Sequence, residues 1–397
     1  MINLARRDVA NHLGRYVLTG YGLGLLIGDT LTMAGVYRGM VDDAKVLLRA
    51  GGADIWVVQQ DTLGPFAEPS SLQDDVYRSL EGLPGVADTG NVAYLTMQVA
   101  HAGNDLRVMV AGFTPGRLGG PAFLVAGRPI ARAHYEAVAD LRTGLEVGDR
   151  IRIRRHDYTV VGLTRRMVSS NGDPMVFIPL EDAQEAQFLR DNDAIVNDRS
   201  RLAENPSVNR PGQPGLLDAV DALQTSSHRV NAVLVRVARG HDPRAVSENI
   251  ARWKHLTAYT SADMEDILVA KLIATAARQI ALFLVILAVV SAAIVAFIIY
   301  TMTLGKMKEI AVLKLIGTRD RVVATMILQE AVGLGVIGVF VGKLAATLWA
   351  PVFPKYVLLE TGDAIRAFAL ALVICALASV LAIRAALHVD PAEAIGG

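Results

Sequence analysis

The sequence predicts an α-helical membrane domain of four transmembrane helices, with a large α/β domain inserted between the first and second helices. Between Arg278 and Lys306 the chain runs for 27 residues without a charge. That length is about 40 Å of helix, enough to cross a bilayer core of about 30 Å. Three other apolar segments are also long enough to span, and short β-rich runs fill the interval after the first of them.

The four spans are predicted at residues 16–37, 271–304, 322–350 and 367–384. The first span follows a basic N-terminal stretch at 1–15, so a cleaved signal peptide is the alternative interpretation. Its apolar run is longer than the apolar core of a typical signal peptide. We therefore expect the first span to be retained as a helix.

Loop charges predict the orientation of the spans. Basic residues outnumber acidic ones in the amphipathic N-terminus and in the segment at 305–321, and the positive-inside rule places both in the cytoplasm. The even number of spans returns the tail at 385–397 to the same side. The segment at 38–270 and the loop at 351–366 are then expected outside, in the periplasm.

The domain at 38–270 is expected to be mixed α/β, with a mobile insertion at 191–229. The insertion is rich in Pro, Gly and Asn and cannot bury enough apolar surface to offset its ordering entropy. His156 and Asp157 are predicted to form the turn of a hairpin. Strands are expected near 54–60, 106–113, 149–155, 158–164, 175–180 and 231–238, and helices near 70–83, 180–190 and 242–254.

Composition and motifs exclude several classes of function. The formal net charge is zero, which argues against a nucleic-acid partner. The single cysteine, Cys375, lies in the fourth span, so the outer domain has no disulfide, as suits a bacterial periplasm. Lys306 and Lys343 follow glycines but precede Met and Leu, so no Walker A motif is present. Because no metal-ligand spacing or nucleophile motif occurs either, we expect no catalytic residue and no bound metal.

Small and acidic residues within the spans are candidates for helix contacts. Gly20, Gly24 and Gly28 recur every four residues and predict close packing, either inside the monomer or at a dimer seam. Glu330 is an acid inside the third span, and a carboxylate in lipid needs a partner. Structural pairing of Glu330 and a role in moving a proton or substrate are the two alternatives.

The segment at 305–321 contains a short amphipathic helix, KEIAVLKLIG, that is predicted to end at Gly317. Ile310, Leu313 and Gly317 are expected to share one face, with basic residues around it. One interpretation is a helix that lies on anionic lipid. The sharper interpretation is a helix that docks into a groove on another protein.

Together these features resemble the FtsX-like permease domain of MacB-type (type VII) ABC transporters. That domain has a segment similar to KEIAVLKLIG between its second and third helices, and an acid in the third that Glu330 matches. The stretch LEVGDRIRIRRHDYTVVGL at 145–163 resembles the family's periplasmic core domain, and DPAEAI at 390–395 its closing segment. The matching residues of the segment are Lys308, Glu309, Ile310, Val312, Leu313, Lys314, Ile316 and Gly317.

The resemblance implies a non-catalytic permease subunit in the bacterial inner membrane. MacB carries its ATPase on the same chain, whereas this sequence shows no ATPase motif. Its layout is therefore closer to that of the DevC-like permeases, whose ATPase is a separate subunit that binds ATP and Mg²⁺. The segment at 305–321 would contact that ATPase. The family also implies a dimer, with a homodimer favoured over a heterodimer, and a periplasmic adaptor as a further partner.

Two functions follow from the resemblance. The first is an efflux or mechanotransmission complex that exports a lipid, lipoprotein, peptide or drug-like substrate. The alternative is an FtsX-type regulator that activates a periplasmic cell-wall hydrolase without transport. A secondary transporter is disfavoured for three reasons: the chain has only four spans, the spans show no inverted repeat, and they contain only two acidic residues.

Overall fold

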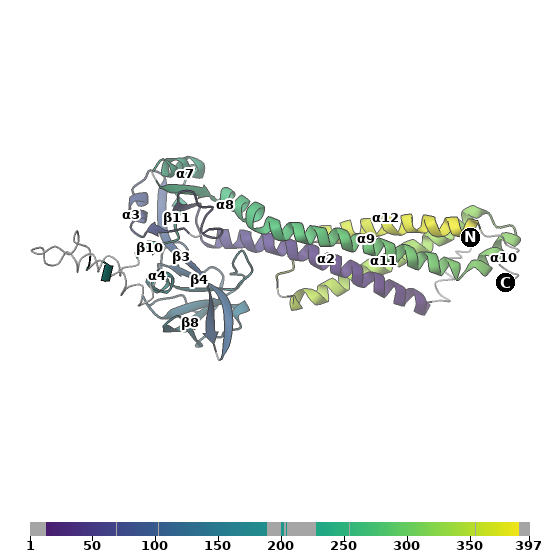
Figure 1. Cartoon of the computed structure of the whole chain (residues 1–397), viewed down its shortest axis with the longest axis horizontal. Coiled ribbons are helices and arrows are strands. Elements are labelled where there is room, and N and C mark those ends of the chain that lie inside the picture. The colour runs from purple at the N-terminus through teal and green to yellow at the C-terminus, as the bar shows by residue number, and fades with distance from the viewer. Residues whose placement is uncertain are drawn as a thin grey trace, which may run out of the picture. The chain divides into compact units, whose positions relative to one another are not determined.

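The computed structural model describes residues 13–68, 70–101, 103–188, 200–201, 204, 228–253, 255–353 and 355–388. Most of the insertion expected at 191–229, most of the N-terminal stretch and most of the tail lie outside these residues. The chain divides into two compact units (Figure 1). The helical unit comprises Met1–Met40 and Thr275–Gly397, and the α/β unit comprises Val41–Ala274.

Four helices of the described chain are long and apolar enough to cross a membrane. They are α2 (Leu13–Ala50), α9 (Ala274–Leu304), α11 (Asp320–Trp349) and α12 (Thr361–Leu387), and the short α10 (Met307–Leu315) separates α9 from α11. Helix α2 continues well beyond the predicted end at residue 37. It does so because Ala44, Leu47 and Leu48 keep a helical spacing of apolar residues and are buried in the α/β unit.

Helices α2 and α11 pack through small residues on both. A Cβ atom added to Gly24 would lie 2.6 Å from the Val341 side chain, and one added to Gly28 would lie 3.0 Å from the carbonyl oxygen of Gly342. A Cβ on Gly338 would meet Leu23 at 2.8 Å. The glycine stripe of the first span therefore contacts α11 of the same chain, and this face is not open to a second copy.

The loop between α11 and α12 is fastened to α2 within the helical unit. The Leu358 amide donates a hydrogen bond of 3.0 Å to the carbonyl oxygen of Gly35. Arg38 forms an ion pair with Glu360 and another, of 2.7 Å, with Asp363. Arg38, the first residue after the predicted span, therefore holds this loop against α2.

The α/β unit is built on a 10-stranded sheet in the order β12-β1-β11-β3-β4-β9-β6-β8-β5, with β7 paired to β3 and β8. Parallel pairs join β4 to β9 and β6 to β8, and the other pairs are antiparallel. A two-stranded sheet joins β2 to β10. The strands are β1 (Ile55–Gln59), β2 (Leu72–Gln73), β3 (Val86–His101), β4 (Asn104–Phe113), β5 (Leu124–Gly127), β6 (Glu136–Asp140), β7 (Arg150–Ile153), β8 (His156–Thr164), β9 (Met175–Pro179), β10 (Arg229–Val230), β11 (Ala232–Val237) and β12 (Leu256–Thr260).

The described part of this unit also contains the short α-helices α3 (Val76–Glu81), α4 (Leu180–Phe188), α7 (Pro243–Ala251) and α8 (Ser261–Ile267), and a single 3-10 turn, Leu141–Thr143, after β6. The predicted helix at 70–83 is wrong in its first half, which forms β2. The predicted turn at His156 and Asp157 is also wrong. The turn is at Arg154 and Arg155, because Arg154 adopts a left-handed φ of 55° and His156 already pairs with Ile153 in the ladder.

We expect Gly24→Leu to destabilise the helical unit, because the new side chain would occupy the space that Val341 fills. Overpacking of this kind costs about 1–3 kcal/mol. Gly22→Leu is the matched control, since a Cβ on Gly22 meets nothing within 4 Å. Thermal stability of the two purified variants in one detergent provides the comparison. Equal melting temperatures would show that the glycine contact is not tight.

Candidate functional site

The structure shows two groups of polar contacts that involve α2, one within each unit, and each group is a candidate functional site. The first group lies in the helical unit, where the chain leaves α9 and enters α10. Lys306 stands before the first residue of α10, and its Nζ atom is 2.9 Å from Oε1 of Glu330 on α11. Both side chains are buried. The third span's acid is therefore ion-paired, as the structural alternative predicted.

Tyr16 joins this ion pair to α2. Its hydroxyl oxygen lies 3.2 Å from Nζ of Lys306, and the ammonium also stands 5.4 Å from the centre of the tyrosine ring. Three segments thus converge on one buried cation: the start of α2, the start of α10 and the middle of α11. Such contacts are strong in an apolar surrounding because little water competes with them.

Helix α10 presents a different face from the one the sequence predicted. Ile310 is buried in the core of the helical unit, and Leu313 is half-buried. The exposed apolar residues, which we call the α10 patch, are Val312, Leu315 and Ile316; the last two are 64% and 76% exposed. The exposed apolar face of α10 is therefore not the face of Ile310, Leu313 and Gly317 that the sequence predicted, because the helix needs Ile310 for its own packing.

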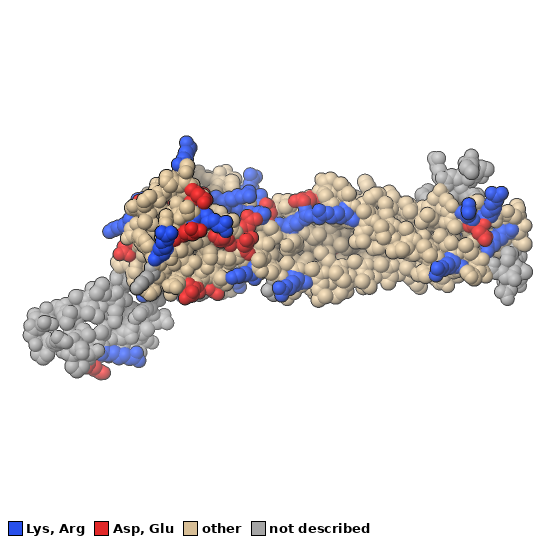
Figure 2. All heavy atoms as spheres, turned by 90° about the horizontal axis from the view of Figure 1, so that it is seen from above, with Lys and Arg blue, Asp and Glu red and all other residues tan. Residues whose placement is uncertain are grey.

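The other predicted residues of this segment lie around the α10 patch. Lys308 and Glu309 are exposed beside it. Lys314 Nζ donates a hydrogen bond of 2.7 Å to the carbonyl oxygen of Leu387, which ties α10 to the end of α12. Gly317 ends the helix with a φ of 89°, as predicted. Figure 2 shows the broad uncharged surface of the helical unit and the charged side chains gathered near its α10 end.

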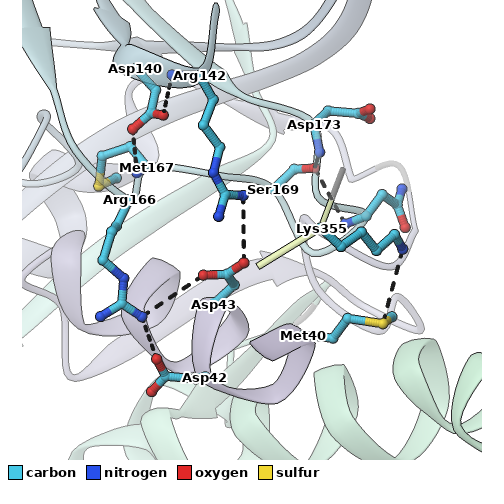
Figure 3. Close-up of polar contacts among 11 residues, drawn as sticks. Met40, Asp42, Asp43, Asp140, Arg142, Arg166, Met167, Ser169, Asp173 and Lys355 are labelled. Carbon is cyan, nitrogen blue, oxygen red and sulfur yellow. Dashed lines mark hydrogen bonds and ion pairs between the residues drawn. The ribbon is translucent and has the colours of Figure 1, made fainter. Parts of the chain in front are cut away.

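The second group of contacts lies in the α/β unit, on the last turns of α2. We call it the α2 joint: Asp42 and Asp43 on the helix, with Arg142 and Arg166 from the sheet (Figure 3). Arg166 pairs with Asp42 and lies 3.9 Å from Asp43, while Arg142 lies 3.7 Å from Asp43. The sequence analysis missed this group, because nothing in the spacing of these residues links positions more than 90 apart.

The sheet topology explains why the two arginines come together. Arg142 follows β6 and Arg166 follows β8, and these neighbouring strands run parallel, so their carboxyl ends share one edge of the sheet. Asp140, fully buried, holds both segments: its carboxylate accepts hydrogen bonds from the Arg142 amide at 3.0 Å and the Met167 amide at 2.7 Å. Burial raises the pKa of Asp140, and these two hydrogen bonds oppose that shift.

Apolar contacts and a second helix reinforce the joint. Leu47 of α2 packs into the core beneath the sheet together with Val138 and Phe177. Lys45 forms an ion pair of 2.6 Å with Glu265 on α8. Helix α8 leads through a π-helical stretch, Leu268–Ile273, into α9. Both helices that connect the two units are therefore anchored in the α/β unit beside each other.

Among the described residues, no cluster of His, Cys, Asp and Glu has the geometry of a metal site. Comparison with protein families gives two matches. The model of the FtsX-like permease C-terminal domain matches residues 281–391, and the model of the MacB-like periplasmic core domain matches residues 17–253. This chain belongs to the MacB/FtsX family of ABC transporter permeases. The permease's α/β unit is the family's periplasmic core domain.

Relatives along the full length agree with this assignment. An uncharacterized ABC transporter permease of Mycobacterium tuberculosis (strain H37Rv) is 25% identical over 400 residues, which cover all of both chains. A putative hemin transport system permease of Staphylococcus haemolyticus is 22% identical over 100% of this chain and 99% of that one. The solved periplasmic region of MacB from Actinobacillus actinomycetemcomitans aligns with 55% of this chain and 94% of that one, at 9% identity and a TM-score of 0.35.

We expect Lys306→Met and Glu330→Leu each to destabilise the helical unit, because each leaves one buried charge without its partner. Breaking a buried pair in this way costs about 3–5 kcal/mol. The double variant leaves no unpaired charge and should cost clearly less than the sum of the single changes. Thermal unfolding of the three variants measures the coupling. Additive losses would mean that the pair contributes nothing as a pair.

Proposed function

We propose that the permease is the membrane subunit of an ATP-driven complex in the bacterial inner membrane, working with a separate ABC ATPase subunit. The observation that carries this proposal is the continuity of α2. One helix of 38 residues begins beside the Lys306–Glu330 pair and ends in the α2 joint. A continuous helix is stiff along its axis, so it suits the transfer of movement from one unit to the other.

The positive-inside rule supports a cytoplasmic position for α10 and for both termini. Lys308, Lys314, Arg319 and Arg321 make this connection basic. The α/β unit is then periplasmic, in agreement with the family of its domain. In this orientation the α10 patch faces the compartment that holds ATP.

The α10 patch is proposed as the contact for the ATPase. Its apolar residues are exposed although their neighbours Lys308 and Glu309 are charged, and an exposed apolar patch with a polar rim is typical of a protein interface. ATP binding would close the ATPase subunits and displace α10. Lys306 would pass that displacement to Tyr16 on α2 and Glu330 on α11.

The complex is proposed to contain a second copy of the permease. Helix α9 is the least buried of the four long helices and exposes Leu282, Phe283, Val289 and Phe297. These residues face lipid or another helix. Since α11 already covers the glycine stripe of α2, α9 is the better candidate for the contact between two copies.

Export of a lipid, lipoprotein, peptide or drug-like compound is the proposed outcome of the cycle, with a periplasmic adaptor as a further partner. Co-purification of the intact complex followed by mass spectrometry would identify the ATPase, any adaptor and any bound substrate together. A deletion strain separates the two outcomes. Retention of a compound in the cell supports export, whereas a defect in cell separation with normal efflux would support regulation of a hydrolase and contradict export.

We expect Leu315→Asp to abolish co-purification of the ATPase while the permease still inserts. A carboxylate placed in an apolar contact must be desolvated, which costs several kcal/mol. Val147→Asp, the same kind of change at an exposed residue of the α/β unit, should leave the complex intact. Full recovery of the ATPase with the Leu315 variant would remove α10 from the interface.

We expect Arg166→Ala to uncouple the α/β unit from the ATPase without loss of the complex. Hydrogen exchange of the purified complex, with and without ATP and Mg²⁺, measures the coupling directly. In the wild type, nucleotide should change the exchange of both α10 and strands β6 and β8. In Arg166→Ala the change in α10 should persist and the change in the strands should fall by about tenfold, the effect of about 1.4 kcal/mol.

Two further variants control this experiment. Arg152→Ala also removes an arginine from an ion pair, with Asp157, but at an exposed site outside the joint, and it should behave as the wild type. Arg166→Lys retains a cation and should restore part of the response. A normal nucleotide response of the strands in Arg166→Ala would contradict the proposed role of the joint.

A further inference from the structure

The α/β unit contains a cavity of about 760 Å³ that plays no part in the α2 joint. Its volume falls in the range of about 300–1,000 Å³ that small-molecule sites occupy. The lining comes from separate segments: the end of β2 and the start of α3, the middle of β3, the loop after β4 and the start of α4. From these segments we propose that the cavity binds a primary amine or guanidinium cation on an aliphatic stem, as in a lysine- or arginine-bearing peptide.

Charge is the first argument. Three carboxylates line the cavity, those of Asp74, Asp75 and Glu181, against two arginines. One of these, Arg117, is already neutralised, because its Nη1 lies 2.6 Å from Glu81 and 3.2 Å from Asp88, which do not line the cavity. The lining therefore keeps an excess of negative charge.

The other charged groups of the lining do not remove this excess. Arg78 lies over the ring of Tyr77 and donates a hydrogen bond of 3.2 Å to its hydroxyl, so one cation remains against three carboxylates. His228 pairs with Asp74 at 3.1 Å. Among the described residues, Asp75 forms no ion pair, and Glu181 meets only His134, at 3.6 Å. At least two carboxylates are thus available to a cationic ligand.

An acceptor without a donor is the second, independent argument. Asn91 lines the cavity and is 7% exposed. Its amide nitrogen donates a hydrogen bond of 2.7 Å to the carbonyl oxygen of Asp74, which fixes the orientation of the side chain. Its Oδ1 atom is buried and accepts no hydrogen bond from any described residue. A buried acceptor of this kind is costly unless a donor reaches it, and an ammonium or guanidinium group supplies donors only.

Apolar residues complete the match to an aliphatic stem. Pro115, Pro179 and Leu180 also line the cavity. Leu180 is held in place because it packs against two apolar cores of the α/β unit. Lysine and arginine place their methylene groups on such surfaces while the charged head contacts polar groups. The cavity thus offers both halves of the chemistry that a basic side chain needs.

The test is calorimetric titration of the full-length permease in nanodiscs of neutral phosphatidylcholine, without the ATPase, at about 0.15 M salt. The probes are a capped Ala-Lys-Ala peptide, the same peptide with an acetylated lysine amine, and spermidine. We expect the lysine peptide to bind and its acetylated form to bind at least about tenfold more weakly. Tighter binding of the peptide assigns the cavity to a polypeptide, and tighter binding of spermidine assigns it to a free polyamine. Equal binding of the two peptides, or no binding of any amine, would overturn the proposal.

Matched variants locate the binding. Asp75→Asn combined with Glu181→Gln removes two exposed carboxylates of the lining and should weaken amine binding about tenfold or more. Asp105→Asn combined with Glu146→Gln removes the same charges at exposed positions outside the lining and should leave binding unchanged. If the first pair fails to fold, the single variants retain the test. Equal loss in both pairs would show a general charge effect and overturn the assignment to this cavity.

Discussion

Burial of charge in an apolar surrounding constrains the helical unit more than any other interaction. A carboxylate on α11 cannot stay there without a cation, and the nearest cation along the fold is Lys306, at the point where the chain turns from α9 into α10. Meeting that requirement brings three helices together at one end of the bundle. Tyr16 is drawn into the same contact. The path of the chain between the second and third long helices follows from this pairing.

In the α/β unit, the α2 joint also uses ion pairs, here to hold the end of a helix against the sheet. Its carboxylates, Asp42 and Asp43, lie on a helix that must also present Leu47 to an apolar core. Two arginines from the carboxyl ends of parallel strands neutralise them. The buried Asp140 fixes the backbone around both arginines. The last turns of α2 are therefore held both by apolar packing and by charge pairs, and Asp43 and Leu47, four residues apart, lie on the same face of the helix.

Much of the architecture could be predicted from the sequence. A helix that crosses lipid must satisfy its backbone hydrogen bonds internally and be apolar over its whole length. The four segments with these properties can be read directly from the sequence. The strands found from the sequence are those with continuous β-branched runs. Strand β3 was missed because Gly90 and Asn91 interrupt its apolar pattern, and β6 because it is short and begins with Glu136. The burial of Ile310 and the meeting of Asp43 with Arg142 depend on tertiary contacts. No local pattern encodes those contacts, so neither the burial of Ile310 nor the α2 joint was predicted.

The interlocked glycines of α2 and α11 limit how these helices can move. Ile337 packs against Gly20, Val341 against Gly24, and Leu23 against Gly338. Side chains of each helix therefore fill the space that glycines leave on the other. If one helix slid gradually along the other, each of these side chains would clash with the backbone of the neighbouring helix. The next matching register lies four residues away, about 6 Å along the axis. The two helices therefore move together as one rigid body or shift by four residues at once. Smaller displacements must occur between other helices of the bundle.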